Sequence, residues 1–158
     1  MLIIPTKQVS KLSKLRRVSR LLDNAISIPG TKISFGLDPI LGLLPGGGDA
    51  LTGGISAYIV VEAAKMGIPR KILWKMVGNI LIDSFAGTIP LVGDLFDVGW
   101  KANIKNVELL EKQLNVAESS KSDRLFIFGL ILLLAIIVLG FAAIAFFTVT
   151  WFWHLIIR

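Results

Sequence analysis

The longest uncharged run in the chain is the feature that most constrains its fold. Residues 125–157 are 33 consecutive residues without Asp, Glu, Lys or Arg. A helix of about 20 apolar residues crosses the hydrocarbon of a bilayer, so this run predicts one C-terminal transmembrane helix. We expect it to cross between residue 124 and about residue 147, and residues 151–154 to form an aromatic anchor at the far interface.

Composition and charge support membrane attachment for the rest of the chain as well. Hydrophobic residues make up 54% of the sequence and charged residues only 18%, which is too few to cover a water-exposed surface. The net charge is +6, and 16 of the 17 Lys and Arg residues precede the apolar run. This asymmetry predicts a cytoplasmic N-terminal region and a C-terminus on the opposite side, in the inner (plasma) membrane if the source is bacterial.

The same inventory excludes several classes of function. There is no cysteine, which excludes thiolate metal sites and cysteine nucleophiles, and a single histidine, His154, which nearly excludes the usual zinc sites and catalytic triads. We therefore expect no enzyme activity and no cofactor. A basic protein could bind nucleic acid, but the lack of polar surface favours anionic lipid headgroups as the partner instead. The N-terminus has no long apolar stretch, so a cleaved signal peptide is not expected.

Residues 8–26 have the pattern of a basic amphipathic helix. Leucines recur at helical spacing, and cationic side chains lie between them. We favour a helix lying on anionic lipid; the alternative is a helix that packs its apolar face on the rest of the protein. The basic residues predicted to face lipid are Lys11, Lys14, Arg16, Arg17 and Arg20.

The middle of the chain contains an internal repeat. The sequence LDPILGLLPGGGD (residues 37–49) aligns without gaps on IDSFAGTIPLVGD (residues 82–94), at an offset of 45 residues. A repeat of this period indicates a duplicated supersecondary unit. Acids are expected to start helices, and Pro and Gly to break them. The predicted breaks are Gly42, Pro45 and Gly48 in the first copy and Gly87, Pro90 and Gly93 in the second.

Each copy is expected to form a short broken-helix hairpin that enters the membrane only part of the way. The apolar segments are too short to cross a bilayer, and their Pro and Gly breaks fall at corresponding positions. Asp83 is expected to start a helix, and a further helix is expected to run from Leu95 past Trp100 into the polar segment. Gly53, Gly54, Ala57 and Ala64 form a small-residue stripe that would let helices approach closely.

Five acids of the repeat region are candidate ion ligands. If the two hairpins meet, their carboxylates and free carbonyls could hold Na⁺, K⁺, Mg²⁺ or Ca²⁺, which prefer oxygen ligands. The alternative is that they cap helices near the headgroups. The candidates are Asp38, Asp49, Asp83, Asp94 and Asp97.

Residues 20–114 resemble a family of membrane proteins catalogued as domain of unknown function 4112. The segments LLPGGGD, IPLVGDLFD and KANIKN carry the likeness. The resemblance implies a small membrane-associated domain and no particular activity. The C-terminal apolar run lies outside it.

Together these features predict an all-α membrane protein in four parts. They are a basic amphipathic helix (residues 1–32), a duplicated membrane-seated domain (33–115), a linker (116–124) and a transmembrane helix (125–157). One copy has too few membrane elements to enclose a pathway, so a homo-oligomer is expected. Two functions remain open: a channel-like or transporter-like assembly for cations or protons, and a membrane-organising scaffold that inserts hairpins in one leaflet and binds anionic lipid or partner subunits.

Overall fold

The computed structural model describes residues 6–24, 26–27, 34–35, 48–87, 100–116 and 123–157. These residues form five helices and one short antiparallel β-ribbon, which confirms the all-α prediction. The elements are α1 (Thr6–Asn24), β1 (Ile26–Ser27), β2 (Ser34–Phe35), α3 (Gly48–Lys65), α4 (Arg70–Gly87), α6 (Ala102–Val116) and α7 (Arg124–Ile156).

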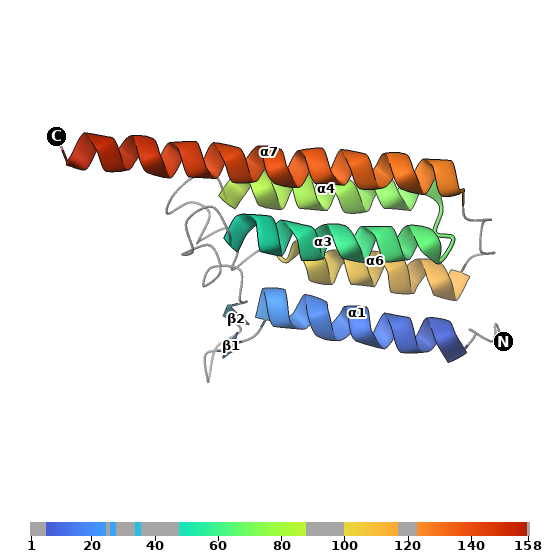
Figure 1. Ribbon diagram of the computed structural model, residues 1–158. Helices are drawn as coiled ribbons and strands as arrows, with labels where there is room; N and C mark the ends of the chain where they lie inside the picture. Colours follow the sequence, from blue (N-terminus) through green and yellow to red (C-terminus); the bar gives the residue numbers. More distant parts are fainter. Residues whose placement is uncertain are drawn as a thin grey trace.

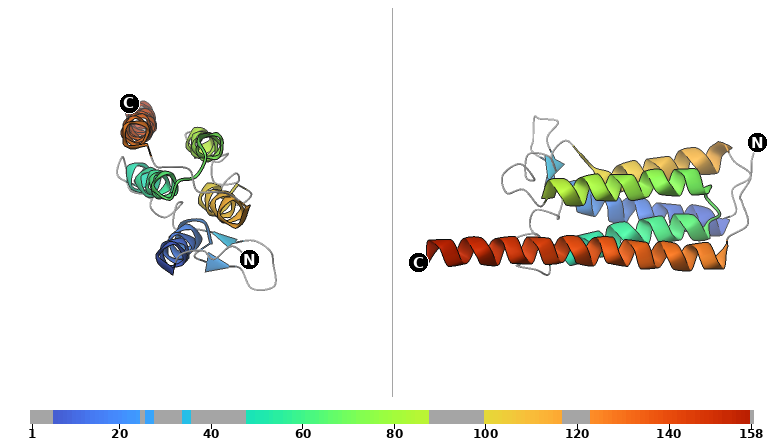
Figure 2. Two further views of the ribbon diagram at one scale, coloured as in Figure 1. Left: turned by 90° about the vertical axis from the view of Figure 1, so that its right-hand side faces the viewer. Right: turned by 90° about the horizontal axis from the view of Figure 1, so that it is seen from above.

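The helices lie side by side with their axes in roughly one direction (Figure 1). Seen end-on, α7 and α1 are on opposite sides of the bundle, and α3, α4 and α6 lie between them (Figure 2). The N-terminal half of α7 packs along α3, and its C-terminal part extends past the ends of the other helices (Figure 1). The most apolar helix and the most basic helix are therefore separated by the width of the bundle.

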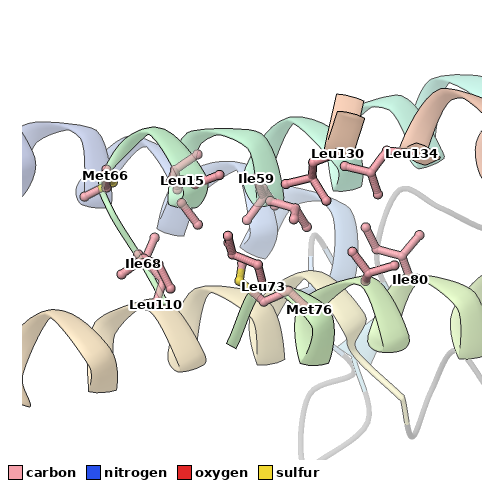
Figure 3. Close-up of a cluster of buried hydrophobic side chains, with 14 of the residues drawn as sticks. Leu15, Ile59, Met66, Ile68, Leu73, Met76, Ile80, Leu110, Leu130 and Leu134 are labelled. Carbon is pink, nitrogen blue, oxygen red and sulfur yellow. The ribbon is translucent and has the colours of Figure 1, made fainter. Parts of the chain in front are cut away.

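A shared apolar core holds all five helices together. Leu15 of α1, Ile59 of α3, Met76 of α4, Leu110 of α6 and Leu134 of α7 are each at most 2% exposed. Figure 3 shows side chains of this core closing the space between the helices. Burying a side chain of this size stabilises the fold by about 1.5–3 kcal/mol.

A tight turn joins α3 and α4. The N–H of Ile68 donates to the carbonyl of Ala63, and the N–H of Gly67 donates to that of Ala64, which is the Schellman pattern of a helix end. Gly67 has a φ of 80°, a left-handed conformation that glycine adopts without a side-chain clash. Pro69 then accepts hydrogen bonds from the first turn of α4. The glycine and proline of this turn carried the signal for a helical hairpin at 66–69, which sequence analysis missed.

Helix α7 confirms the predicted C-terminal apolar helix. It is continuous over 33 residues, and the side chain of Asp123 accepts hydrogen bonds from the N–H groups of Leu125 and Phe126 to cap its start. Arg70 ties this end to α4 by an ion pair of 2.8 Å with Asp123 and by lying over the ring of Phe126. The linker is thus followed by a well-defined helix start.

Some but not all residues of the predicted small-residue stripe on α3 lie at helix contacts. A Cβ added at Gly53 would lie 3.0 Å from Cγ1 of Val138, so the glycine permits the close approach of α3 and α7. Ala64 is buried in the core and Ala57 packs against it. A Cβ added at Gly54 would meet nothing within 4 Å, so this glycine does not lie in a helix contact.

One expected helix start is wrong, and one expected helix is interrupted where the structure describes it. Asp83 does not begin a helix but lies near the C-terminal end of α4, because α4 starts at the Gly67–Pro69 turn and continues without a break. The helix expected to continue past Trp100 is also absent there: Trp100 and Lys101 are not helical, and α6 begins at Ala102. In the first repeat, α3 begins at Gly48, one residue before the predicted cap Asp49.

Candidate functional site

The predicted ion site falls largely outside the described residues. Asp49 lies in the first turn of α3 and Asp83 near the end of α4, so both are at the end of the bundle past which α7 extends (Figure 1). Gly48 begins α3 and Gly87 ends α4. Within the described ranges, no three metal-binding side chains of the His, Cys, Asp or Glu types come together. The remaining predicted residues, which lie outside the described part, are Asp38, Gly42, Pro45, Pro90, Gly93, Asp94 and Asp97.

The apolar face of α1 packs against other helices of the protein and not against lipid. Leu15 and Leu22 are 2% and 3% exposed, because α1 packs on α6 and α3. The expectation of a helix lying on lipid with its apolar face is therefore wrong for this arrangement, and the alternative, packing on the rest of the protein, is what the structure shows. The cause is that α6 and α3 offer apolar side chains at matching positions, among them Val107 and Leu110.

The five predicted lipid-facing cations divide into two groups. Lys11 forms an ion pair of 2.8 Å with Glu62, and Arg16 one of 2.6 Å with Glu111, so these two connect α1 to α3 and α6. The other three are exposed and make no ion pair with any described residue. These three are Lys14, Arg17 and Arg20, and we call them the open cations of α1.

Glu62 is a buried acid at the centre of a small ion cluster with two partly exposed lysines. Its carboxylate is 2.8 Å from Nζ of Lys11 and 2.8 Å from Nζ of Lys65. Burial raises the pKa of Glu62, but the hydrogen bonds from the two lysines outweigh burial and the net pKa is lowered. The same contacts raise the pKa of Lys65. The cluster therefore favours the charged forms and fastens α1 to α3.

We expect Glu62→Gln to lower the free energy of unfolding at pH 7 by about 1 kcal/mol, since the lysines are partly exposed and solvent screens them. A lowered folded-state pKa stabilises the fold above the unfolded value of 4.5 and loses this effect as pH falls through the folded pKa. Detergent-solubilised protein should thus show a smaller variant effect at pH 4 than at pH 7. Glu108→Gln, at an exposed glutamate, is the control and should change neither value.

Side-chain amides of two asparagines connect α4 to α6. Nδ2 of Asn79 donates to Oδ1 of Asn106 at 2.7 Å, and Nδ2 of Asn106 donates to the carbonyl of Met76 at 3.2 Å. Asn106 is fully buried. These bonds across helices make the asparagines packing residues rather than ligands for an ion.

Asp23 is a buried acid that sequence analysis missed. It lies at the end of α1 and is 6% exposed, and its carboxylate accepts hydrogen bonds of 2.8 Å from the Ile104 N–H and from Nδ2 of Asn103. Asp23 therefore caps the first turn of α6 across the bundle. Burial raises the pKa of Asp23 despite these bonds. The sequence carries no local sign of this role, because the two partners are 80 and 81 residues away.

The C-terminal helix leaves a long apolar surface uncovered. The segment Arg124–Leu155 is long and apolar enough to cross a membrane, and only 17% of its most apolar window is buried inside the protein. A core helix of a soluble domain would be mostly buried. The exposed side chains run the full length of the helix and include Phe128, Ile136, Leu139, Phe147 and Trp153. Length, composition and exposure together indicate association with a membrane.

Comparison with known proteins identifies a family but no characterised relative. A family model described as "Domain of unknown function (DUF4112)" matches residues 11–114, which confirms the resemblance seen in the sequence. The matched region covers α1 from residue 11 onward, all of α3 and α4, and all but the last residues of α6, and it ends before α7. Neither the curated proteins nor the solved structures gave a match.

Proposed function

Because the chain belongs to the family described as Domain of unknown function (DUF4112), which carries no assigned activity, we propose a function from the chemistry of its helices. The protein is a membrane-anchored scaffold: α7 crosses the bilayer and holds the bundle of α1, α3, α4 and α6 at the anionic cytoplasmic leaflet. The observation that carries this proposal is the contrast between two parallel helices, α7 without a charge from residue 125 to residue 157 and α1 with three open cations.

The open cations limit how deep the bundle can lie. Glu62 is nine residues from Gly53 along α3, and Arg20 is nine residues from Lys11 along α1. Lys11 contacts Glu62, Gly53 faces Val138, and α1 runs opposite to α3 (Figure 1). At about 1.5 Å per residue, Arg20 therefore reaches roughly the level of Val138.

An exposed Lys or Arg at the bilayer centre costs roughly 3 kcal/mol. The arrangement that keeps all three open cations out of hydrocarbon begins the span near Val138. About 20 residues of α7 follow this position, which matches the ~30 Å of hydrocarbon. The exposed Trp151 and Trp153 then lie toward the far interface.

This depth supports contact between the bundle and anionic headgroups. Arg20 lies at the boundary and Arg17 one turn farther into the cytoplasm, each contributing about 1 kcal/mol near an anionic surface. It also leaves the exposed Leu125 and Phe128 outside the hydrocarbon. A second copy of the chain would cover them, in keeping with the expected homo-oligomer.

Conduction of cations or protons draws no support from the described helices. Buried apolar side chains from all five helices form one cluster in their interior (Figure 3). Three of the five candidate acids lie outside the described part of the chain. The scaffold is therefore the function that the geometry supports best, and a route between copies stays a prediction from sequence.

Single-cysteine labelling in vesicles tests the proposal, and the chain has no cysteine of its own to interfere. Exposed positions for the label are Ser13 and Leu21 in α1, Phe147 in α7 and Ile157 at its C-terminal end. An impermeant maleimide should label the two α1 sites from the cytoplasmic side and Ile157→Cys only from the other side. Phe147→Cys, near the middle of the proposed span, should react at least tenfold more slowly than Ser13→Cys.

A headgroup-sensitive fluorophore on Leu21→Cys tests the lipid contact in the same vesicles. Its emission should shift to shorter wavelength with phosphatidylglycerol and not with phosphatidylcholine, and salt should reverse the shift. Equal labelling of Phe147→Cys and Ser13→Cys would show that α7 does not span. An emission independent of lipid charge would remove the anionic-leaflet part of the proposal.

A further inference from the structure

A groove of about 400 Å³ lies between α4 and α6. Its volume is within the range of ~300–1,000 Å³ usual for small-ligand sites. Side chains of both helices line it, and the bond between Asn79 and Asn106 holds the two helices together at its base. It is therefore a built feature of the helix pair and not a gap between independent segments.

The floor of the groove is apolar and open. Ile82 of α4 and Leu109 of α6 line it, and Gly78 lies between them. A Cβ added at Gly78 would meet nothing within 4 Å. The absence of a side chain at this position is what leaves space for an apolar ligand.

Cations surround this apolar floor. Lys75 and Lys112 are exposed and make no ion pair with any described residue. Lys105 also lines the groove, and its Nζ lies 3.0 Å from the centroid of the Trp100 ring, which holds this lysine beside the groove. A ring contact of this kind leaves the ammonium charge in place.

One carboxylate is present among the three lysines. Glu108 is one helical turn from Lys105 and from Lys112, yet it forms no ion pair within 4.0 Å among the described residues. Three ammonium groups against one carboxylate leave the rim with two net positive charges, which favours an anion.

The groove is oriented along the proposed membrane normal. Ile82 lies toward the end of α4 at which α7 extends past the bundle, and Lys75 lies seven residues back toward the cytoplasmic end (Figure 1). At 1.5 Å per residue the two are about 10 Å apart. A ligand entering from the leaflet would meet Ile82 first and Lys75 and Lys112 farther in.

We infer that this groove binds one anionic phospholipid, with an acyl chain along Gly78, Ile82 and Leu109 and the headgroup phosphate between Lys75 and Lys112. The inference rests on the proposed function, because the lipid reaches the groove from the leaflet in which the protein is anchored. It assigns a specific lipid site to α4 and α6, whereas the scaffold itself requires only a charged surface on α1.

Native mass spectrometry of the full chain released from detergent tests the site, with dioleoyl phosphatidylglycerol as the probe. We expect the wild type to retain one phosphatidylglycerol per chain and to retain phosphatidylcholine at least fivefold more weakly. Gly78→Leu places a side chain in the groove at a position where an added Cβ meets nothing within 4 Å, and it should weaken phosphatidylglycerol binding at least fivefold. The double variant Lys75→Gln/Lys112→Gln should do the same.

Two controls match these variants. Gly54→Leu makes the same change at a helical glycine that is equally open, in α3. Lys71→Gln/Arg124→Gln removes two exposed charges outside the groove. Both should retain the lipid, and circular dichroism should show all variants folded, since leucine favours helix more than glycine does.

Three results would overturn the site. The first is retention by Gly78→Leu equal to that of the wild type. The second is equal loss in the control variants, and the third is full competition by inorganic phosphate, which would make the headgroup alone the ligand. If cysteine labelling shows α7 crossing the bilayer while Gly78→Leu binds normally, only the groove fails and the scaffold stands.

Discussion

Gly53→Leu is expected to separate α7 from α3 and to lower the free energy of unfolding by about 3 kcal/mol. The Cβ alone would lie 3.0 Å and 3.1 Å from the two methyl carbons of Val138, and a leucine places three more carbons in the same contact. Forcing extra carbons into a packed interface typically costs about 1–3 kcal/mol. The measurement is unfolding by sodium dodecyl sulfate in mixed micelles, followed by circular dichroism.

Gly54→Leu is the control for this experiment, because the neighbouring glycine faces open space and the substitution should raise helix stability by about 1 kcal/mol. A second variant identifies the contact: Val138→Ala removes both methyl groups and should recover at least about 1 kcal/mol in the Gly53→Leu background. A coupling energy near zero between the two positions would mean that α3 and α7 do not meet there.

The elements that sequence analysis predicted well are those whose signal is local. The apolar run of residues 125–157 becomes α7 because no charge interrupts it, and α3 begins within one residue of Asp49. The turn at Gly67 and Pro69 also has a local signal, a glycine followed two residues later by a proline. The repeat motifs predict two hairpins, one in each copy. The hairpin in the described residues instead joins α3, which begins in the first copy, to α4, which ends in the second.

The features that sequence analysis missed depend on contacts between distant residues. The α1 cations illustrate this. The sequence around Lys11 and Arg16 does not distinguish them from Lys14 and Arg17. Lys11 and Arg16 form ion pairs because the folded chain brings Glu62 and Glu111 next to them. Periodicity shows that α1 has an apolar face, but it does not show whether lipid or another helix covers that face. The groove on α4 and α6 is likewise formed by two helices whose facing residues no local pattern relates.

Asp23→Ala is expected to lower the free energy of unfolding by about 3 kcal/mol at neutral pH. The substitution leaves the N–H of Ile104 and the side-chain amide of Asn103 without their acceptor in a buried place, and each such group costs about 1–3 kcal/mol. It also removes the negative charge at the first turn of α6. The same mixed-micelle unfolding measures the change, and hydrogen exchange of the Ile104 amide should accelerate.

Asp23→Asn separates the lost hydrogen bonds from the lost charge. The side-chain carbonyl of the new asparagine can still accept a hydrogen bond from the Ile104 N–H. Its amide can donate to Oδ1 of Asn103 when the Asn103 side-chain amide flips. This oxygen has no hydrogen-bond partner among the described residues. We therefore expect a cost within about 1 kcal/mol.

Burial raises the pKa of Asp23 above 3.8, so folding favours the protonated form. The stability linked to it is fully present below that value and is lost as pH rises through the folded pKa. Because Asp23→Asn does not titrate, its stability should fall less than that of the wild type between pH 4 and pH 7. If instead the two proteins lose stability in parallel over this interval, Asp23 is charged throughout and does not bear the burial cost.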